Sequence, residues 1–336
     1  MKMITSLWIG SYAKKEEPGI YKVNIDKDRE TLTVTGRYAG ASNPSFLAEA
    51  DGFLYAACES MEGTAALFQI NDDGLNLKGA ADAGDMAPCH IYAEGASAWT
   101  ANYGGSVTKY ERHGTSIVKS AFSKREGSGP NQERQDASHV HSITPFPNGK
   151  HLLVCDLGSD ALAVYEKTKL MVVKEVKTAP GSGPRMALFH PKLPVVYVMN
   201  ELDSTVLVYK VGQDGDIIHL DTIAALPDGY NGKHTGADLQ LGLNNRYLYA
   251  SVRGWDGFAI FDIEAEGTLS QPRHVDGEGK TPRSFCVLPD APYLIAAYQD
   301  SNNVALFKLE ENGMPLFTGN EITITKPVCV ILKGAD

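Results

Sequence analysis

The sequence predicts an all-β protein, a seven-bladed β-propeller in which one blade is closed by strands from both ends of the chain. Two observations predict this fold. The apolar runs are short, alternating or β-branched, and Asn, Asp, Gly and Pro separate them, which is the pattern of strands and turns. In addition, a unit of about 45 residues recurs seven times along the 336 residues. Several short strands in each of several such units are typical of a propeller.

The repeat is clearest where two stretches read almost alike. Residues 183–191 (GPRMALFHP) lead into VVYVMNE and TVLVY, and residues 281–289 (TPRSFCVLP) lead into YLIAAYQ and NVALF. The middle run of each unit has an anchor residue, and the seven anchors are Trp8, Tyr55, Trp99, Leu153, Tyr197, Tyr249 and Ile295. An aromatic residue follows each anchor by 11 to 13 positions, at Tyr21, Phe68, Tyr110, Tyr165, Tyr209, Phe261 and Phe307. We therefore expect the same strands in every unit.

The two ends of the chain complement each other. The first unit lacks the strand that opens every other copy, and residues 326–332 (KPVCVIL) have the character of that strand. Pairing the two ends would complete one blade and remove the free edges of the ring. We expect a single propeller domain over residues 1–336.

Composition excludes several classes of protein. A chain that is 43% hydrophobic and 21% charged is globular, and its formal net charge of −10 argues against a nucleic-acid partner. Apolar runs are too short for a membrane span or a signal peptide, so we expect no membrane partner and a cytoplasmic location. The five cysteines are far apart, without a C-x-x-C pair, which favours buried reduced thiols.

Two connections are longer than the repeat requires. Residues 123–138 contain almost nothing apolar, and residues 227–236 form the second excursion. Long loops in compact domains are often functional. We expect the first to act as a lid, because it leads directly into the most polar opening strand.

Charged residues recur at equivalent positions of the repeat. The first strand of each blade lines the central channel, and counting 12 residues back from the anchor aligns His141, Arg185 and Arg283. We place His90, His139 and Asp238 in the same layer, within one or two residues. The position four residues after the anchor carries Glu59, Glu201, Arg253 and Gln299. Because charges in a narrow channel are costly unless paired or used on a ligand, two interpretations stay open: an ion network between blades, or an anion site.

Other chemistries lack their motifs. The chain has no G-x-S-x-G elbow, no H-E-x-x-H and no Walker loop. His139 and His141 are spaced to share one face of a strand, but no third ligand is fixed by spacing. We predict no metal and no cofactor.

Several motifs together resemble the seven-bladed propeller lactonase family. They are GPR at 183–185, FHP at 189–191, NEL at 200–202, RQ at 134–135, HVHS at 139–142 and DLGSD at 156–160. That family includes the bacterial propeller-type 6-phosphogluconolactonase and the fungal carboxy-muconate lactonising enzyme, and the resemblance covers residues 4–332. It implies a metal-independent site at one mouth of the channel, with His141, Arg185, Glu201 and Arg253 as catalytic residues. The chain departs from the family at Met186, where a histidine is common.

The resemblance implies hydrolysis of a small anionic sugar lactone, with 6-phosphoglucono-1,5-lactone of the pentose phosphate pathway as the leading expectation. Arginines would bind the anion and the developing oxyanion, and His141 would be the base, with Glu201 as the alternative. The expected substrate-binding residues are Arg283, His139, His90, Gln299 and Asp238. The alternatives are a muconate-type lactonising enzyme, which is an intramolecular lyase, and a non-catalytic binding scaffold. Arginine binds both phosphate and carboxylate, so the two substrate anions stay open.

Overall fold

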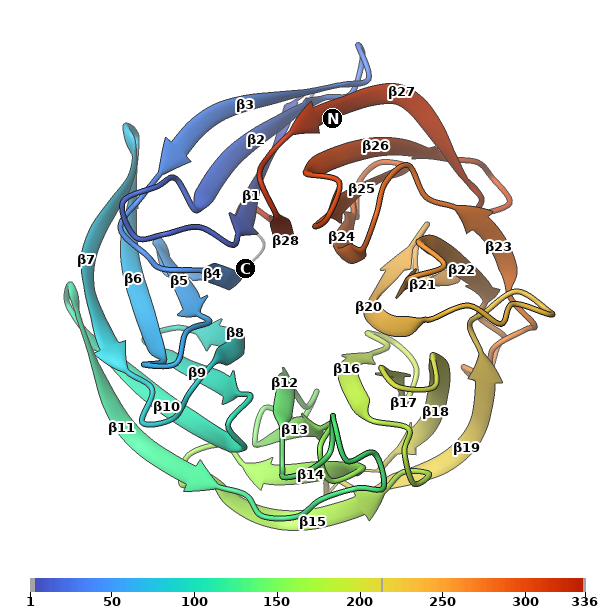
Figure 1. Cartoon of the computed structure of the whole chain (residues 1–336), viewed down its shortest axis with the longest axis horizontal. Helices are drawn as coiled ribbons and strands as arrows, with labels where there is room; N and C mark the ends of the chain where they lie inside the picture. The colour runs from blue at the N-terminus through green and yellow to red at the C-terminus, as the bar shows by residue number, and fades with distance from the viewer. Residues whose placement is uncertain (1–3, 213, 335–336) are drawn as a thin grey trace.

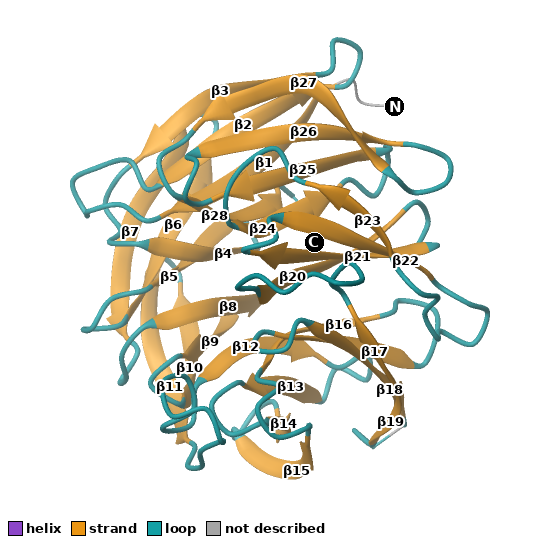
Figure 2. Ribbon diagram, turned by 45° about the vertical axis from the view of Figure 1, so that its right-hand side comes forward, coloured by secondary structure: helices purple, strands orange, loops and turns teal. Residues whose placement is uncertain are grey.

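Seven four-stranded antiparallel sheets stand as blades around a central axis (Figure 1). This computed structural model describes residues 4–212 and 214–334. Loops alone join the strands in this part of the chain, which contains no helix (Figure 2). Within the described ranges there is accordingly no helix of the length and apolar character that a membrane crossing requires. The predicted all-β propeller with seven blades is confirmed.

The strands follow one another from the innermost to the outermost position of each blade. The first blade contains β28 (Pro327–Leu332), β1 (Ile4–Ser11), β2 (Ile20–Asp26) and β3 (Thr31–Tyr38). The second to fourth blades contain β4 (Pro44–Ala50), β5 (Phe53–Cys58), β6 (Thr64–Asn71) and β7 (Gly74–Asp82); β8 (Pro88–Glu94), β9 (Ser97–Asn102), β10 (Ser106–His113) and β11 (Ser116–Lys124); and β12 (Val140–Pro145), β13 (His151–Asp156), β14 (Ala161–Glu166) and β15 (Met171–Lys177). The fifth to seventh blades contain β16 (Pro184–Phe189), β17 (Val195–Asn200), β18 (Thr205–Val211) and β19 (Ile217–Ala224); β20 (Thr235–Gly242), β21 (Tyr247–Arg253), β22 (Gly257–Asp262) and β23 (Arg273–Asp276); and β24 (Pro282–Val287), β25 (Tyr293–Tyr298), β26 (Asn303–Leu309) and β27 (Pro315–Thr323).

The repeat in the sequence corresponds to fixed places in the blade. All seven anchors lie on the second strand and are at most 2% exposed. The aromatic residues lie on the third strand, where six are buried and Tyr21 is half-buried. The apolar clusters lie between neighbouring blades, as between the first and the seventh. Each buried side chain of this size contributes roughly 1.5–3 kcal/mol, so every blade is stabilised by its two neighbours.

Both ends of the chain form the first blade, as predicted. Strand β28 pairs with β1 in antiparallel register, with Leu7 opposite Leu332 and Ile9 opposite Val330. The last strand of the chain is therefore the innermost strand of the first blade. This pairing closes the ring and gives β1 a hydrogen-bonded neighbour on both sides.

Each innermost strand carries a β-bulge near its start. At this point one residue is left out of the ladder with the second strand: Val328 in β28, Ser45 in β4, Cys89 in β8, His141 in β12, Arg185 in β16 and Arg283 in β24. In β20, Ala237 and Asp238 together oppose Ser251. A bulge bends its strand and aims a side chain that no longer belongs to the regular alternation. We refer to these residues as the bulge ring.

Candidate active site

Two rings of residues form one mouth of the channel. The bulge ring is the first. The second, which we call the mouth ring, is the residue four positions after each anchor: Tyr12, Glu59, Tyr103, Leu157, Glu201, Arg253 and Gln299. The backbone links the two rings, because the N–H of Glu201 donates to the carbonyl of Gly183 at 2.7 Å, directly before β16. The N–H of Glu59 donates in the same way to Asn43, at 2.9 Å.

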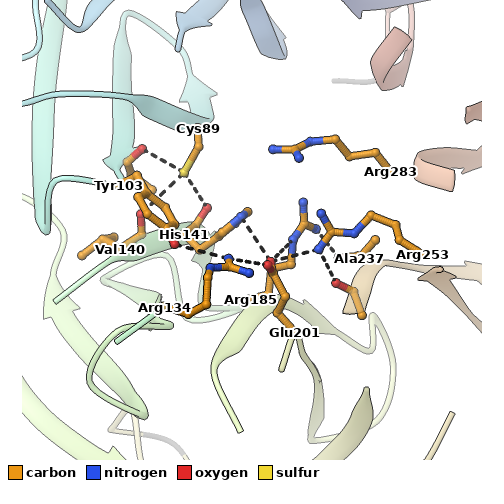
Figure 3. Close-up of polar contacts among 12 residues, drawn as sticks. Cys89, Tyr103, Arg134, Val140, His141, Arg185, Glu201, Ala237, Arg253 and Arg283 are labelled. Atoms are coloured by element: carbon orange, nitrogen blue, oxygen red, sulfur yellow. Dashed lines mark hydrogen bonds and ion pairs between the residues drawn. The ribbon is translucent and has the colours of Figure 1, made fainter. Parts of the chain in front are cut away.

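The carboxylate of Glu201 is the centre of the site (Figure 3). Its Oε1 accepts a hydrogen bond from Arg134 Nη2 at 2.6 Å. Its Oε2 lies 2.9 Å from Arg185 Nε and 3.1 Å from Arg253 Nη2. The side chain of Glu201 is only 3% exposed. Three guanidinium groups around one carboxylate leave this cluster with two positive charges in excess (3 − 1 = 2).

The two ring arginines are held by main-chain carbonyls as well. Arg185 Nη1 donates to Ala237 O, and Arg253 Nη2 donates to Gly236 O at 2.9 Å. Among the described residues the Nε atoms of both arginines are buried and have no hydrogen-bond partner; the Arg185–Glu201 contact lacks hydrogen-bond geometry. These arginines are oriented and still have donor capacity.

His141 lies beside this cluster and is buried. Its Nε2 is 3.9 Å from Glu201 Oε2, too far for a direct hydrogen bond. Its Nδ1 is buried without a partner among the described residues. The ring of Tyr103 packs edge-on against the imidazole of His141, with ring centroids 6.3 Å apart. The main-chain carbonyl of His141 accepts a weak hydrogen bond from Cys89 Sγ. One ring nitrogen therefore faces the carboxylate without being bonded to it.

Electrostatics fix the protonation of both groups. Burial lowers the pKa of His141 well below 6.5, and Arg185 lowers it further against the opposing effect of Glu201. Burial alone would raise the pKa of Glu201, but Arg253 and Arg185 hold it well below its usual range. At neutral pH the site consequently presents a neutral imidazole and an ionised carboxylate.

The segment after β11 brings Arg134 to the site. Gln135 is completely buried and donates from Nε2 to Asp160 Oδ1 at 2.7 Å and to Leu157 O at 2.9 Å. Asp156 is buried too, and it accepts from Arg125 and Ser138 at 2.7 Å each. The predicted lid spans residues 123–138; its first two residues belong to β11, and these contacts hold residues 125–139 at several points as a strap. Its opening stays a prediction.

Arg283 is at the mouth but outside the cluster. Its guanidinium lies over the ring of Tyr12 at 5.5 Å and 3.8 Å from Glu59 Oε2. Tyr12 in turn donates to Glu59 Oε2 at 2.8 Å. Arg283 thus shares the mouth with Arg253, and it also lines a small chamber together with His141 and Arg185.

The family of the protein follows from comparison with known sequences. A family model described as lactonase, 7-bladed β-propeller, matches residues 6–332. The chain belongs to the seven-bladed β-propeller lactonase family. Among its relatives, a 6-phosphogluconolactonase from Bacillus subtilis is 29% identical over 96% of this chain and 97% of its own length. An uncharacterised protein from Lactococcus lactis is 31% identical over 97% of this chain and all of its own.

Solved structures share the fold of this propeller lactonase along its whole length. The crystal structure of a candidate 6-phosphogluconolactonase from Bacteroides fragilis is 28% identical, with a TM-score of 0.90, over 98% of both chains. That of a protein from Lactobacillus plantarum is 27% identical, with a TM-score of 0.92, over 98% of this chain and 99% of that one.

The other residues predicted for the site of this propeller lactonase are more dispersed. His139 stacks on Tyr103 with centroids 4.3 Å apart, and its nitrogens contact Tyr103 O at 2.7 Å and Asp136 Oδ1 at 3.0 Å. Both nitrogens are thus occupied, and His139 positions Tyr103. Gln299 lines the mouth beside Arg253.

His90 and Asp238 lie deeper in the channel. Together with His141 and Arg185, they line a chamber of about 10 Å³. His90 and Asp238, but neither His141 nor Arg185, also line a separate cavity of about 360 Å³. In the second and third blades the bulge falls ten residues before the anchor, at Ser45 and Cys89, so His90 is one residue beyond it. That displacement takes His90 away from the mouth.

The side chains that could coordinate a metal ion are not grouped together in the described part of this lactonase. Among the described residues no group of three or more His, Cys, Asp or Glu side chains could hold a metal ion. His139 and His141 do not form the pair that their spacing allows, because His141 belongs to the bulge and His139 precedes β12.

Sequence reasoning missed three side chains at the mouth. Tyr12 and Tyr103 occupy the same offset from their anchors as Glu201, so the spacing that singled out Glu201 also identifies them. Arg134 follows no repeat position, and the RQ motif at 134–135 was its only signal.

Proposed function

We propose that this protein hydrolyses a sugar lactone, with 6-phosphoglucono-1,5-lactone as its substrate. The observation that carries the proposal is the cluster of Arg134, Arg185 and Arg253 around Glu201, with its excess of positive charge next to the neutral imidazole of His141. Membership of the lactonase family and a relative named 6-phosphogluconolactonase support it. The reaction would then belong to the pentose phosphate pathway.

In the proposed reaction, His141 Nε2 takes a proton from the attacking water while the water oxygen bonds to the lactone carbonyl carbon. The carbonyl oxygen becomes an oxyanion, and N–H groups of Arg185 and Arg253 donate to it. When the intermediate collapses, the bond from the carbonyl carbon to the ring oxygen breaks. The imidazolium returns its proton to that oxygen. The products are a hydroxyl group and a carboxylic acid, which ionises at neutral pH.

The geometry favours His141 over Glu201 as the base. Three guanidinium groups occupy the carboxylate of Glu201 and depress its pKa, so it is a poor proton acceptor. The 3.9 Å between His141 Nε2 and Glu201 Oε2 leaves each atom able to contact one shared water. In this arrangement Glu201 orients the arginines and the water, and His141 takes the proton.

Assays of the purified protein with three lactones test the proposal. We expect rapid hydrolysis of 6-phosphogluconolactone, slower hydrolysis of unphosphorylated gluconolactone, and no turnover of a carboxy-muconate. Preferred turnover of the muconate would instead identify a lactonising enzyme. Absence of turnover with all three would leave a binding scaffold.

A pH–rate profile tests the base. Because its pKa is well below 6.5, His141 stays neutral over the neutral range, and we expect kcat/KM to be flat between about pH 7 and pH 8, above the titration of Asp238 and of the substrate phosphate. His141→Ala should lower kcat/KM by about 10²–10⁴-fold. If His141→Ala kept normal kcat/KM and the same acid limb while Glu201→Gln lost activity, Glu201 would be the base.

A further inference from the structure

A second cavity opens at the mouth, next to the arginine cluster. It measures about 360 Å³, and its walls include Lys233, His234, Arg253, Arg283, Gln299 and Asp300. Ligand sites for small molecules are usually of this size or larger. Arg253 belongs both to this cavity and to the Glu201 cluster, so a molecule in the cavity would continue into the proposed site of reaction.

Arg283 is the main charged group in this cavity, and its donors are free. Its guanidinium makes no hydrogen bond to any residue that the structure describes, and its nearest carboxylate oxygen, in Glu59, is 3.8 Å away. Figure 3 shows it apart from the network of dashed contacts around Glu201. The side chain is only 18% exposed, so these donors are largely removed from water. A guanidinium in such a place is suited to two oxygens of one anion.

Lys233 adds a second cation to the wall of this cavity. It lies on the exposed connection before β20 and forms no ion pair within the described ranges. Among the described wall residues Asp300 is the one carboxylate; it accepts from the hydroxyl of Thr281 at 2.5 Å and from Gln299 Nε2 at 3.0 Å, and both of these residues also line the cavity. Gln299 Oε1 is buried, has no partner in the part of the chain that the structure describes, and can accept a hydrogen bond from a hydroxyl group.

We propose that this cavity is the phosphate subsite of the enzyme, in which Arg283 and Lys233 bind the phosphate of the substrate. Arg253, which lies between this cavity and the Glu201 cluster, would contact the reacting carbonyl group. The inference rests on the proposed lactone hydrolysis and names the part of the substrate that gives specificity. Phosphate carries nearly two negative charges and can contact Arg283 and Lys233 at once, whereas a carboxylate carries one charge. Glu59 and Asp300 offset part of the charge of these two cations. Binding energy from this remote group would hold the lactone ring beside His141.

Lys233→Met tests the subsite, because an exposed side chain can be replaced without disturbing the core. We expect KM for 6-phosphogluconolactone to rise about 10-fold, with kcat changed less than about 2-fold. KM for unphosphorylated gluconolactone should change less than about 2-fold, and inhibition by inorganic phosphate should weaken in parallel. Lys78→Met, on the outer strand β7, is the matched control and should leave all these values at wild type.

Equal changes with both lactones, or none with either, would overturn the phosphate subsite while leaving lactone hydrolysis intact. If the wild-type protein hydrolyses neither lactone, the proposed function itself fails. In that case titration calorimetry with inorganic phosphate still decides the subsite: binding that Lys233→Met weakens and Lys78→Met does not would support it, and absence of binding would refute it.

Discussion

Arg185 is held by two partners in different directions, and this constrains what can replace it. Its Nε faces Glu201 Oε2 at 2.9 Å, while its Nη1 donates to Ala237 O. A lysine has a single nitrogen and cannot keep both contacts. Arg185→Lys should therefore lower kcat by about 10²-fold or more, as loss of an oxyanion donor typically does.

The exposed Arg37→Lys is the matched control for this substitution. Steady-state kinetics with the phosphorylated lactone measure the effect, and thermal unfolding checks that both variants are folded. Wild-type turnover in Arg185→Lys would reduce Arg185 to a partner in an ion network between blades.

Asp238 is a buried carboxyl group whose titration should be visible in stability. Burial raises its pKa to about 6, although Arg185 lowers it. A raised pKa means that the folded state binds the proton more tightly, so the group's contribution to stability is lost as the pH rises through 6. Asp238→Asn does not titrate. Its free energy of unfolding relative to wild type should therefore increase by about 2 kcal/mol between about pH 4.5 and pH 7.5.

Denaturant unfolding of both proteins across this pH range measures the difference. Asp28→Asn, at an exposed position, should show no such trend. A difference for Asp238→Asn that is independent of pH, or that falls with pH, would contradict the expected protonation.

Among the elements, the strap over residues 125–139 depends on one buried amide. Gln135 Nε2 bridges Leu157 O and Asp160 Oδ1, which fixes the preceding residue, Arg134, against Glu201. Gly158 permits the close passage of the strap, since a Cβ there would lie 1.9 Å from Ala137 O. Gln135→Ala removes the side-chain donor of the buried Leu157 carbonyl, while Asp160 Oδ1 keeps the N–H of Gly183, and it should destabilise the protein by about 1–3 kcal/mol. It should also lower kcat/KM about 10-fold by releasing Arg134.

A double-mutant cycle separates the two effects. If the strap acts through Arg134, Gln135→Ala adds little further loss of activity in an Arg134→Met background. Gln271→Ala, at an exposed position, is the control for removal of a glutamine. Fully additive losses of activity would mean that the strap does not act through Arg134.

The strands were predictable from sequence because their signals are local. Each anchor, such as Tyr197, repeats with its aromatic partner, here Tyr209, and these positions became the second and third strands of each blade. Long-range placement was harder to predict. His90 falls one residue beyond the bulge residue Cys89, within the margin of the prediction, and it lines a chamber with His141 and Arg185. The contact of Arg134 with Glu201 spans 67 residues and depends on the path of the strap.

At the scale of the whole molecule, ring closure depends on the last strand of the chain. Removing residues 326–336 deletes β28, which is the innermost strand of the first blade and covers apolar residues of its neighbours. The truncated chain should expose these surfaces, lose cooperative unfolding and aggregate. Size-exclusion chromatography and thermal unfolding measure this outcome. A soluble monomer with an unchanged Tm would disprove closure by β28.

The bulges place side chains of the site at positions that take no part in strand pairing. A bulge residue is not paired in the ladder, so it can be substituted without a change in the strand register of its blade. Three blades place His141, Arg185 and Arg283 at this position, whereas three others place Ser45, Cys89 and Val328 there. The bulge ring therefore offers seven equivalent positions, and some of them carry side chains that take no part in the proposed reaction. Substitution at such a position can change the substrate specificity, and Ser45 and Cys89 are the first positions to randomise in a search for altered substrates.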